Sequence, residues 1–167
     1  MAFIGNVVSA KAQCKSIKDP FTGEEKTSYI HTIFGVLVIK MELEKDGSAI
    51  FYFRDAEPRI IDTPIPAGSP FLMLLEGGET IELALMEECK PNSGAISGSA
   101  SGTAFTEWLE KMKMTKEQIN ALSQKKVTHL KYKRHDGSES IFDCKKQKLY
   151  KMEKNLMAAS KCMAGTK

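Results

Sequence analysis

The stretch 70–88, PFLMLLEGGETIELALMEE, constrains the fold of this chain most because its local structure is the most strongly determined. Residues 71–75 are apolar at every position, as in a strand covered on both faces. In residues 80–85 the odd positions are large and apolar, which is typical of a strand with one buried face. Gly77 and Gly78 between the two runs allow the positive φ angles of a two-residue turn. The stretch therefore predicts a β-hairpin near the middle of an antiparallel sheet.

Two further hairpins are predicted by Asp-Gly turns between strand-like segments. Residues 37–44 alternate with a period of two, and residues 49–54 are rich in aromatic side chains that favour strands. Asp46 and Gly47 form the turn between them. The same pattern recurs near the end of the chain, in the segments 127–134 and 138–143 around Asp136 and Gly137.

The remaining segments divide into loops, one further strand and two helices. Residues 55–70 contain four prolines and predict an irregular or edge crossing, whereas the glycine- and serine-rich residues 90–103 predict a flexible loop. Residues 104–114 fit a helix or a strand, and we favour a strand beside residues 79–87. Thr115 as N-cap, with Gln118 completing a capping box, predicts a helix over 116–124.

The last element expected is an amphipathic helix over 145–163, in which apolar residues recur at spacings of three and four. Together the elements predict an α+β domain. Its core is an antiparallel twisted β-sheet meander of about six to eight strands, a size usual for such sheets, with one or two helices packed on one face. The length of 167 residues fits a single domain, and no apolar run is long enough for a transmembrane helix.

Charge is unevenly distributed along the chain. Residues 1–102 carry 9 basic and 14 acidic side chains, whereas residues 103–167 carry 15 basic and 7 acidic ones. A basic segment of this kind is typical of a surface for an anionic partner, although lysines also cover surfaces that bind nothing. Lysines in the first turn of the expected last helix oppose the helix dipole, which makes this cluster the candidate binding surface. Its members are Lys145, Lys146, Lys148 and Lys151.

The start of the chain allows two interpretations. Residues 1–12 are largely apolar and end in the small residues Ala10 and Ala12, as in the last part of a secretory signal peptide, so the domain would comprise residues 13–167. The alternative is a first strand containing Phe3, Ile4, Val7 and Val8.

The four cysteines fit either disulfides or free thiols. Cys144 and Cys162 at opposite ends of a helix over 145–163 would lie about 27 Å apart, too far for a disulfide, so Cys144 would need Cys14 or Cys89 as its partner. Four reduced thiols are the other interpretation.

Motifs of catalytic, phosphate-binding and cofactor sites are not found, so we expect no cofactor and no catalytic residues. His129 and His135, with Asp136, Glu139 and Asp143, could meet around the last hairpin as a metal or acid–base site. Polar turn residues explain the same pattern more simply.

Several motifs of the chain resemble those of the small uncharacterised exported proteins common in Bacteroidota. They are Asp19-Pro20-Phe21-Thr22-Gly23, Leu75-Glu76-Gly77-Gly78-Glu79, Thr115 to Ile119 with Leu122, and the closing hairpin and helix. The resemblance implies export and an α+β fold.

We therefore expect a non-catalytic binding or accessory domain that is exported to the periplasm or the extracellular space. An anionic glycan, an envelope component or another protein is the expected partner. Two alternatives remain: a hydrolase using the His129/His135 hairpin, and a cytosolic domain that binds nucleic acid through its basic C-terminal third.

Overall fold

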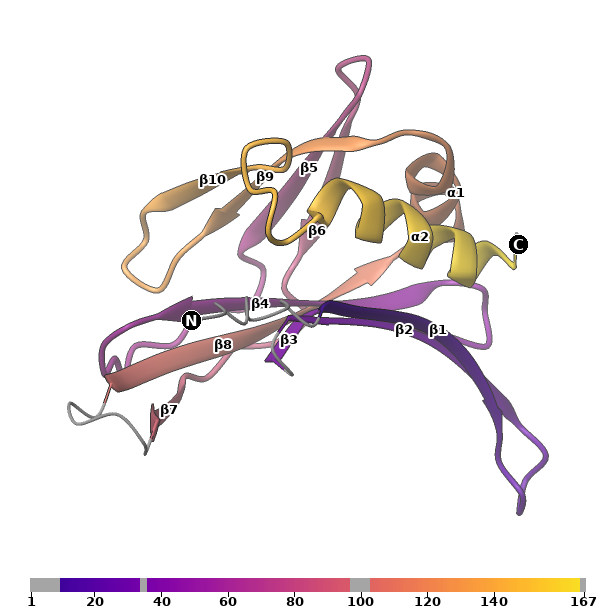
Figure 1. The fold of residues 1–167 in the computed structure, drawn as a ribbon, viewed down its shortest axis with the longest axis horizontal. Coiled ribbons are helices and arrows are strands. Elements are labelled where there is room, and N and C mark those ends of the chain that lie inside the picture. The colour runs from indigo at the N-terminus through magenta and orange to yellow at the C-terminus, as the bar shows by residue number, and fades with distance from the viewer. Residues whose placement is uncertain (1–9, 34–35, 97–102, 166–167) are drawn as a thin grey trace, which may run out of the picture.

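The computed structural model describes residues 10–33, 36–96 and 103–165. In this part of the chain, ten strands form two antiparallel sheets, and Figure 1 shows them as two layers. The large sheet has six strands in the order β1 (Ala10–Lys18), β2 (Glu25–Ile33), β3 (Val36–Leu43), β4 (Ala49–Glu57), β8 (Thr103–Met114) and β7 (Asn92–Ile96). The small sheet has four, in the order β10 (Glu139–Asp143), β9 (Val127–Lys133), β5 (Pro70–Leu75) and β6 (Thr80–Ala84).

Two helices lie in the same layer as the small sheet, and the second of them lies over the large sheet beside it (Figure 1). Helix α2 (Met152–Ala164) contacts β1, β2, β3 and β9, and helix α1 (Lys116–Gln124) contacts α2. The α+β class, the antiparallel pairing and the packing of helices on one face are thus confirmed.

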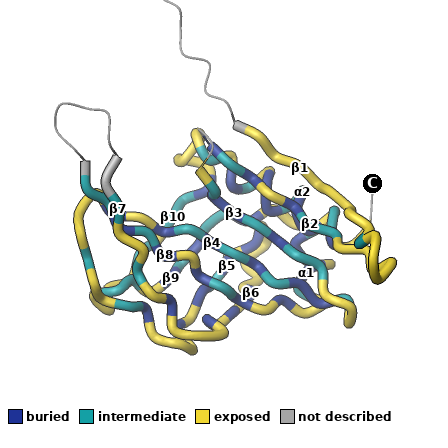
Figure 2. Tube along the Cα trace, turned by 90° about the horizontal axis from the view of Figure 1, so that it is seen from below, coloured by how far each residue is buried: buried dark blue, intermediate teal, exposed yellow. Residues whose placement is uncertain are grey.

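The core lies between the two layers and is rich in large apolar side chains. Figure 2 shows the buried residues along the central strands, whereas β1 is exposed along its length. Phe53 and Phe71 meet edge-on with ring centroids 5.1 Å apart, and Phe53 meets Tyr132 in the same way at 5.0 Å. These aromatic contacts join β4 of the large sheet to β5 and β9 of the small sheet.

Local signals in the sequence predicted the turns and the first helix correctly. All three glycine turns join the strands expected of them, with positive φ angles at Gly47, Gly77, Gly78 and Gly137. The Thr115 hydroxyl accepts the Gln118 N–H, and the Gln118 side chain accepts the Thr115 N–H, so the capping box is complete.

The pairing of the strands differs from the sequence expectation. The strands form two sheets instead of one, because β8, a strand as we favoured, pairs with β4 and β7. Its pairing with the hairpin of residues 70–85 is limited to an isolated bridge between Leu85 and Met112. Residues 71–75 are not covered on both faces, since Leu74 is 36% exposed.

Part of the expected loop 90–103 is strand β7. A Cβ atom at Gly94 would come within 3.2 Å of the Phe105 ring, so the glycine lets β7 lie against β8. Residues 97–102 of that loop lie outside the described residues.

The last helix begins at Met152, seven residues later than its periodicity predicts. The Asp143 carboxylate accepts the backbone N–H groups of Lys145 and Lys146, both at 3.0 Å, and turns the chain at the end of β10. Side chain to backbone bonds of this kind compete with helix formation. Residues 144–151 therefore form an irregular connection, called here the β10–α2 connection.

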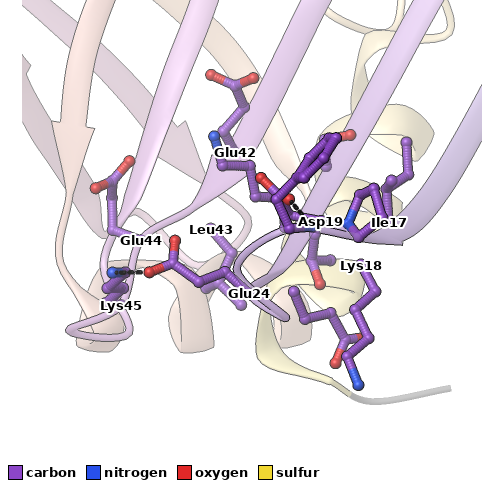
Figure 3. Close-up of a pocket in the computed structure, with 14 residues that line it drawn as sticks. Ile17, Lys18, Asp19, Glu24, Glu42, Leu43, Glu44 and Lys45 are labelled. Atoms are coloured by element: carbon purple, nitrogen blue, oxygen red, sulfur yellow. Dashed lines mark hydrogen bonds and ion pairs between the residues drawn. The ribbon is translucent and has the colours of Figure 1, made fainter.

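The hairpin of β1 and β2 curves away from the rest of the large sheet (Figure 1). At its tip, Asp19 accepts the backbone N–H groups of Phe21 and Thr22, and the Phe21 side chain is 95% exposed. A hollow of about 1000 Å³ lies between this hairpin and the β3–β4 turn, where Glu24 pairs with Lys45 at 2.6 Å (Figure 3). Five acidic and three basic side chains line this hollow, so its net charge does not favour an anionic ligand.

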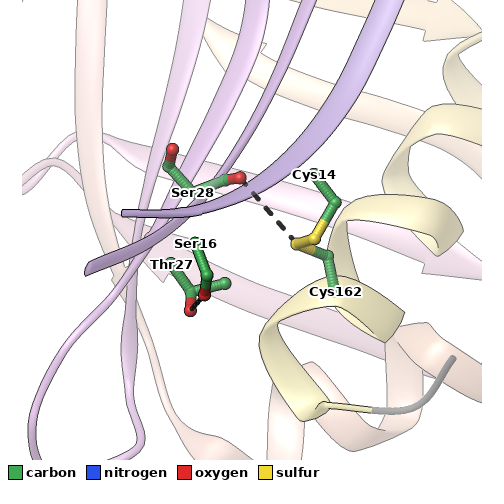
Figure 4. The surroundings of a disulfide bond; sticks show 5 residues. All are labelled: Cys14, Ser16, Thr27, Ser28 and Cys162. Carbon is green, nitrogen blue, oxygen red and sulfur yellow. Dashed lines mark hydrogen bonds between the residues drawn. A yellow bond between two sulfur atoms is a disulfide. The ribbon is translucent and has the colours of Figure 1, made fainter. Parts of the chain in front are cut away.

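A disulfide joins Cys14 on the edge strand β1 to Cys162 on α2 (Figure 4). Their Cα atoms are 6.0 Å apart, and the bond closes a sequence separation of 148 residues. Cys89 and Cys144 are free and buried, so the interpretation as four reduced thiols is wrong, and Cys144 has neither of its expected partners.

Of residues 1–12, whose sequence fits a signal-peptide remnant or a first strand, the structure describes only the last three. Residues 1–9, including the proposed first strand with Phe3, Ile4, Val7 and Val8, lie outside the described residues. Ala10, Lys11 and Ala12 are the first residues of β1 and pair with Ile33, Thr32 and His31. Among the described helices, none has the length and apolar character needed to cross a bilayer.

The disulfide makes a direct prediction about thiol content. Denatured but unreduced protein should react with a thiol reagent at two cysteines, because only Cys89 and Cys144 are free, and at four after reduction. Quantitative thiol titration with intact-mass measurement tests this. Four reactive thiols before reduction, in protein purified without a reductant, would contradict the Cys14–Cys162 bond.

Candidate functional site

The β10–α2 connection carries the predicted lysines and forms one wall of a charged surface. Lys145, Lys148 and Lys151 line a hollow of about 500 Å³, and Lys126 and Lys154 complete its basic rim. Cys144, Glu153 and Met157 are its remaining lining residues, and we call it the basic hollow. Lys146, the fourth predicted lysine, lies outside this lining and pairs with Asp143 at 3.7 Å. The structure thus brings together three of the four predicted lysines.

Negative charge in the basic hollow is small compared with the positive charge. Glu153 is its sole acidic lining residue and pairs with Lys126 at 3.2 Å. Within the described residues, Lys145, Lys148, Lys151 and Lys154 form no ion pair with a carboxylate. Lysines without carboxylate partners create a positive potential that attracts anions.

The backbone at Lys151 is strained. Lys151 has φ 46° and ψ 37°, and among the described residues it is the only non-glycine residue with a positive φ. It occupies the N-cap position of α2, where its side chain cannot accept a helix N–H. A lysine at the positive end of a helix is also electrostatically unfavourable. Lys151 is therefore unfavourable in three respects: its backbone conformation, its lack of a capping side chain and its charge at this end of the helix.

Neighbouring side chains hold Lys151 in this conformation. The Asn155 amide donates to the backbone carbonyls of Lys151 at 3.0 Å and Tyr150 at 3.3 Å. The Tyr29 hydroxyl in turn donates to Asn155 Oδ1 at 2.7 Å, which links the turn to the large sheet. His31 Nε2 also lies 3.0 Å from the Tyr150 carbonyl oxygen. Strain that several contacts maintain is characteristic of functional sites.

A second group of polar residues is buried between the two sheets. Asp55 and Glu57 face inward from β4, and Arg134 follows β9. Arg134 Nη2 lies 2.6 Å from Glu57 Oε1, and its Nε lies 3.5 Å from Asp55 Oδ2. His135 Nε2 contacts the same Glu57 oxygen at 3.0 Å, and its ring stacks on Trp108 at 4.9 Å. The cluster joins the two sheets where their apolar core ends.

Glu110 lies beneath this cluster on β8 and is completely buried. Neither of its carboxylate oxygens has a hydrogen-bond partner among the described residues. Burial, with a smaller contribution from the Asp55 charge, raises the pKa of Glu110 to about 8. The residue is therefore protonated at neutral pH and contributes no charge to the core.

The alternative histidine site around the last hairpin is not assembled. His129 lies 3.8 Å from Asp143, whereas His135 turns inward to Glu57. Within the described part of the chain, no three His, Cys, Asp or Glu side chains are placed to hold a metal ion. His31 is a buried residue of strand β2.

Lys126 and Lys154 were not included in the basic surface predicted from the sequence. It was also not predicted that Asp55, Glu57 and Glu110 are buried between the sheets. Lys154 is one turn from Lys151 and could have been included by helical periodicity, but Lys126 comes from the α1–β9 turn, and only the tertiary fold brings it near. Asp55 and Glu57 continue the inward face of Phe51 and Phe53 at a period of two, which was a usable signal. Glu110 shares a face with Trp108 and Met112 in the same way.

Comparison with known proteins adds no relative: family models, curated proteins and solved structures all give no match to this chain.

The buried Glu110 carboxyl generates a prediction about pH. The unfolded chain releases this proton near pH 4.5, whereas the folded protein keeps it until about pH 8. The free energy of unfolding contributed by this group should therefore fall as the pH rises through this window. The free energy of unfolding of Glu110→Gln should therefore rise relative to that of wild type as the pH rises through this window. The difference should grow by up to about 1.4 kcal/mol per pH unit.

Urea denaturation at several pH values measures this difference. Glu82→Gln, at an exposed carboxylate on β6, is the matched control and should follow the wild-type pH profile. Parallel profiles for wild type and Glu110→Gln would show that Glu110 titrates alike in the folded and unfolded states.

Proposed function

We propose that this protein is a non-catalytic, extracytoplasmic binding domain that holds an anionic glycan of the cell envelope in its basic hollow. The observation that carries the proposal is the convergence of five lysines on one hollow whose single carboxylate is already paired. Mutual repulsion between these lysines destabilises the folded protein, and a polyanionic ligand would relieve it.

The strained turn supports the same surface. A residue with a favourable N-cap side chain at position 151 would stabilise α2, by typically about 1 kcal/mol. The chain instead has a lysine there in a left-handed conformation, held by Asn155. In this conformation Lys151 lines the same hollow as Lys148.

An acidic glycan fits this surface better than single-stranded nucleic acid does. Proteins that bind single strands combine basic grooves with aromatic side chains on which bases stack. Among the described residues, no aromatic side chain lines the basic hollow. Ion pairs with sulfate or carboxylate groups need no such platform.

The disulfide supports the extracytoplasmic part of the proposal. Disulfides form and persist in oxidising compartments and are rare in the cytosol. Cys14–Cys162 ties the exposed edge strand β1 to α2, the helix that follows the lysine-rich connection. The bond would therefore stabilise the part of the fold that presents the proposed surface.

Charge-removal variants test the function. Lys145→Ala/Lys148→Ala/Lys151→Ala should weaken the binding of a heparin hexasaccharide at least tenfold at about 50 mM salt. The dependence of log Kd on log salt concentration should also become shallower, because fewer counterions are displaced. Isothermal titration calorimetry at several salt concentrations measures both.

The matched control is Lys11→Ala/Lys15→Ala/Lys18→Ala on β1, which removes the same charge from exposed positions. This variant should keep most of the wild-type affinity. Equal losses in the two triple variants would indicate non-specific attraction by net charge, and no loss in the first would exclude the basic hollow as the site.

A further inference from the structure

A second hollow lies on the other side of the β10–α2 connection, between the two sheets. It has a volume of about 250 Å³, and four of its eleven lining residues are aromatic. Phe53, Tyr132, Phe142 and Tyr150 contribute the rings, and Asp55 contributes the acidic group. The one basic lining residue, Arg54, is already paired with Glu107 at 2.6 Å. We call it the aromatic hollow. Gln147 and Tyr150 of the connection face it, whereas Lys145, Lys148 and Lys151 line the basic hollow.

The aromatic rings are fixed by packing against one another. Phe53 and Tyr132 meet edge-on with centroids 5.0 Å apart, and Phe142 and Tyr150 do so at 5.7 Å. The first pair is buried in the core, and the second pair is partly exposed at the outer end. The hollow therefore has a rigid inner wall and an outer rim near the surface.

Asp55 is buried in this hollow without full compensation of its charge. The residue is 8% exposed. Its Oδ1 accepts the Ala56 N–H at 3.0 Å and the Tyr132 hydroxyl at 3.4 Å, but its Oδ2 is buried and has no hydrogen-bond partner among the described residues. A buried polar atom without a partner calls for an explanation.

Arg134 does not satisfy this oxygen. Its Nε lies 3.5 Å from Asp55 Oδ2 without forming a hydrogen bond, and its Nη2 is bound to Glu57 at 2.6 Å. Burial accordingly raises the pKa of the Asp55 carboxyl above its usual value, although Arg134 opposes the shift. Because Oδ2 has almost no accessible surface, Asp55 would act on a cation in the hollow through its negative charge and not by direct contact.

From these contacts we infer that the aromatic hollow binds a small organic cation, a quaternary ammonium group. Aromatic faces attract cations through their quadrupoles, most strongly when the cation is shielded from water, and such rings recognise methylated ammonium groups. Asp55 supplies the counter-charge. A metal ion fits poorly, because Asp55 is the sole His, Cys, Asp or Glu side chain of the lining. The volume is below the roughly 300–1,000 Å³ of sites for drug-sized ligands, so the ligand is small.

This site is separate from the basic hollow and does not depend on the proposed anionic ligand. A quaternary ammonium group occurs in free choline and in trimethyl-lysine side chains, and the chemistry of recognition is the same for both. Titration with each compound separates the two sources, since the tighter binder identifies the natural form of the group.

Choline and its neutral isostere 3,3-dimethylbutan-1-ol test the inference on the wild-type protein. NMR titration should show saturable binding of choline, with shift changes at Phe53, Tyr132, Phe142 and Tyr150. The uncharged alcohol has the same shape and should bind at least tenfold more weakly. Absence of saturable binding by choline and by trimethyl-lysine, or equal binding of choline and the alcohol, would overturn the inference.

Variants at the rim distinguish binding from folding. Tyr150→Ala should weaken choline binding at least tenfold, whereas Tyr150→Phe, which keeps the ring, should bind within about threefold of wild type. Tyr52→Ala removes a ring from outside the hollow and should bind as wild type does. Asp55→Asn should also weaken binding at least tenfold, and its thermal unfolding midpoint checks that it folds. Equal affinities of Tyr150→Ala and Tyr150→Phe would contradict the assignment.

Discussion

The ion pair between Glu57 and Arg134 is the interaction on which the arrangement of the two layers depends. The inward face of β4 changes from apolar at Phe51 and Phe53 to acidic at Asp55 and Glu57. Two buried carboxylates would be costly against an apolar sheet, because an uncompensated charge in a protein interior is strongly unfavourable. Arg134 and His135, at the end of β9, meet this charge from the opposite layer. The small sheet is thereby fixed over β4.

The two hollows follow from this placement. With β9 held over β4, the chain that leaves β10 must pass along the side of the core before α2 can pack on β2 and β3. Asp143 turns it at the beginning, and Asn155 holds it at the end. The β10–α2 connection therefore presents its lysines outward and Tyr150 towards the aromatic rings. One irregular segment thus forms a wall of both proposed binding sites.

Local structure was predictable from the sequence because its causes are local. A turn such as Asp46–Gly47 and the capping box of Thr115 and Gln118 depend on φ angles and hydrogen bonds within a few residues. The division into two sheets depends instead on which strands pair, and the long pairing of β4 with β8 spans an intervening hairpin that joins another sheet. The lysine cluster stays a prediction, and the reason given for it is wrong for three of its members. Lys145, Lys146 and Lys148 precede α2, and only Lys151 is at its end.

Lysine side-chain NMR tests most directly whether the basic hollow is an anion-binding surface. The unmodified protein, labelled at its lysines, would be titrated with the heparin hexasaccharide, and each ammonium signal followed separately. If the basic hollow binds the hexasaccharide, Lys145, Lys148, Lys151 and Lys154 should show the largest shifts and saturate together. Largest shifts at Lys11, Lys15 and Lys18 of β1, or small shifts spread evenly over all lysines, would contradict it.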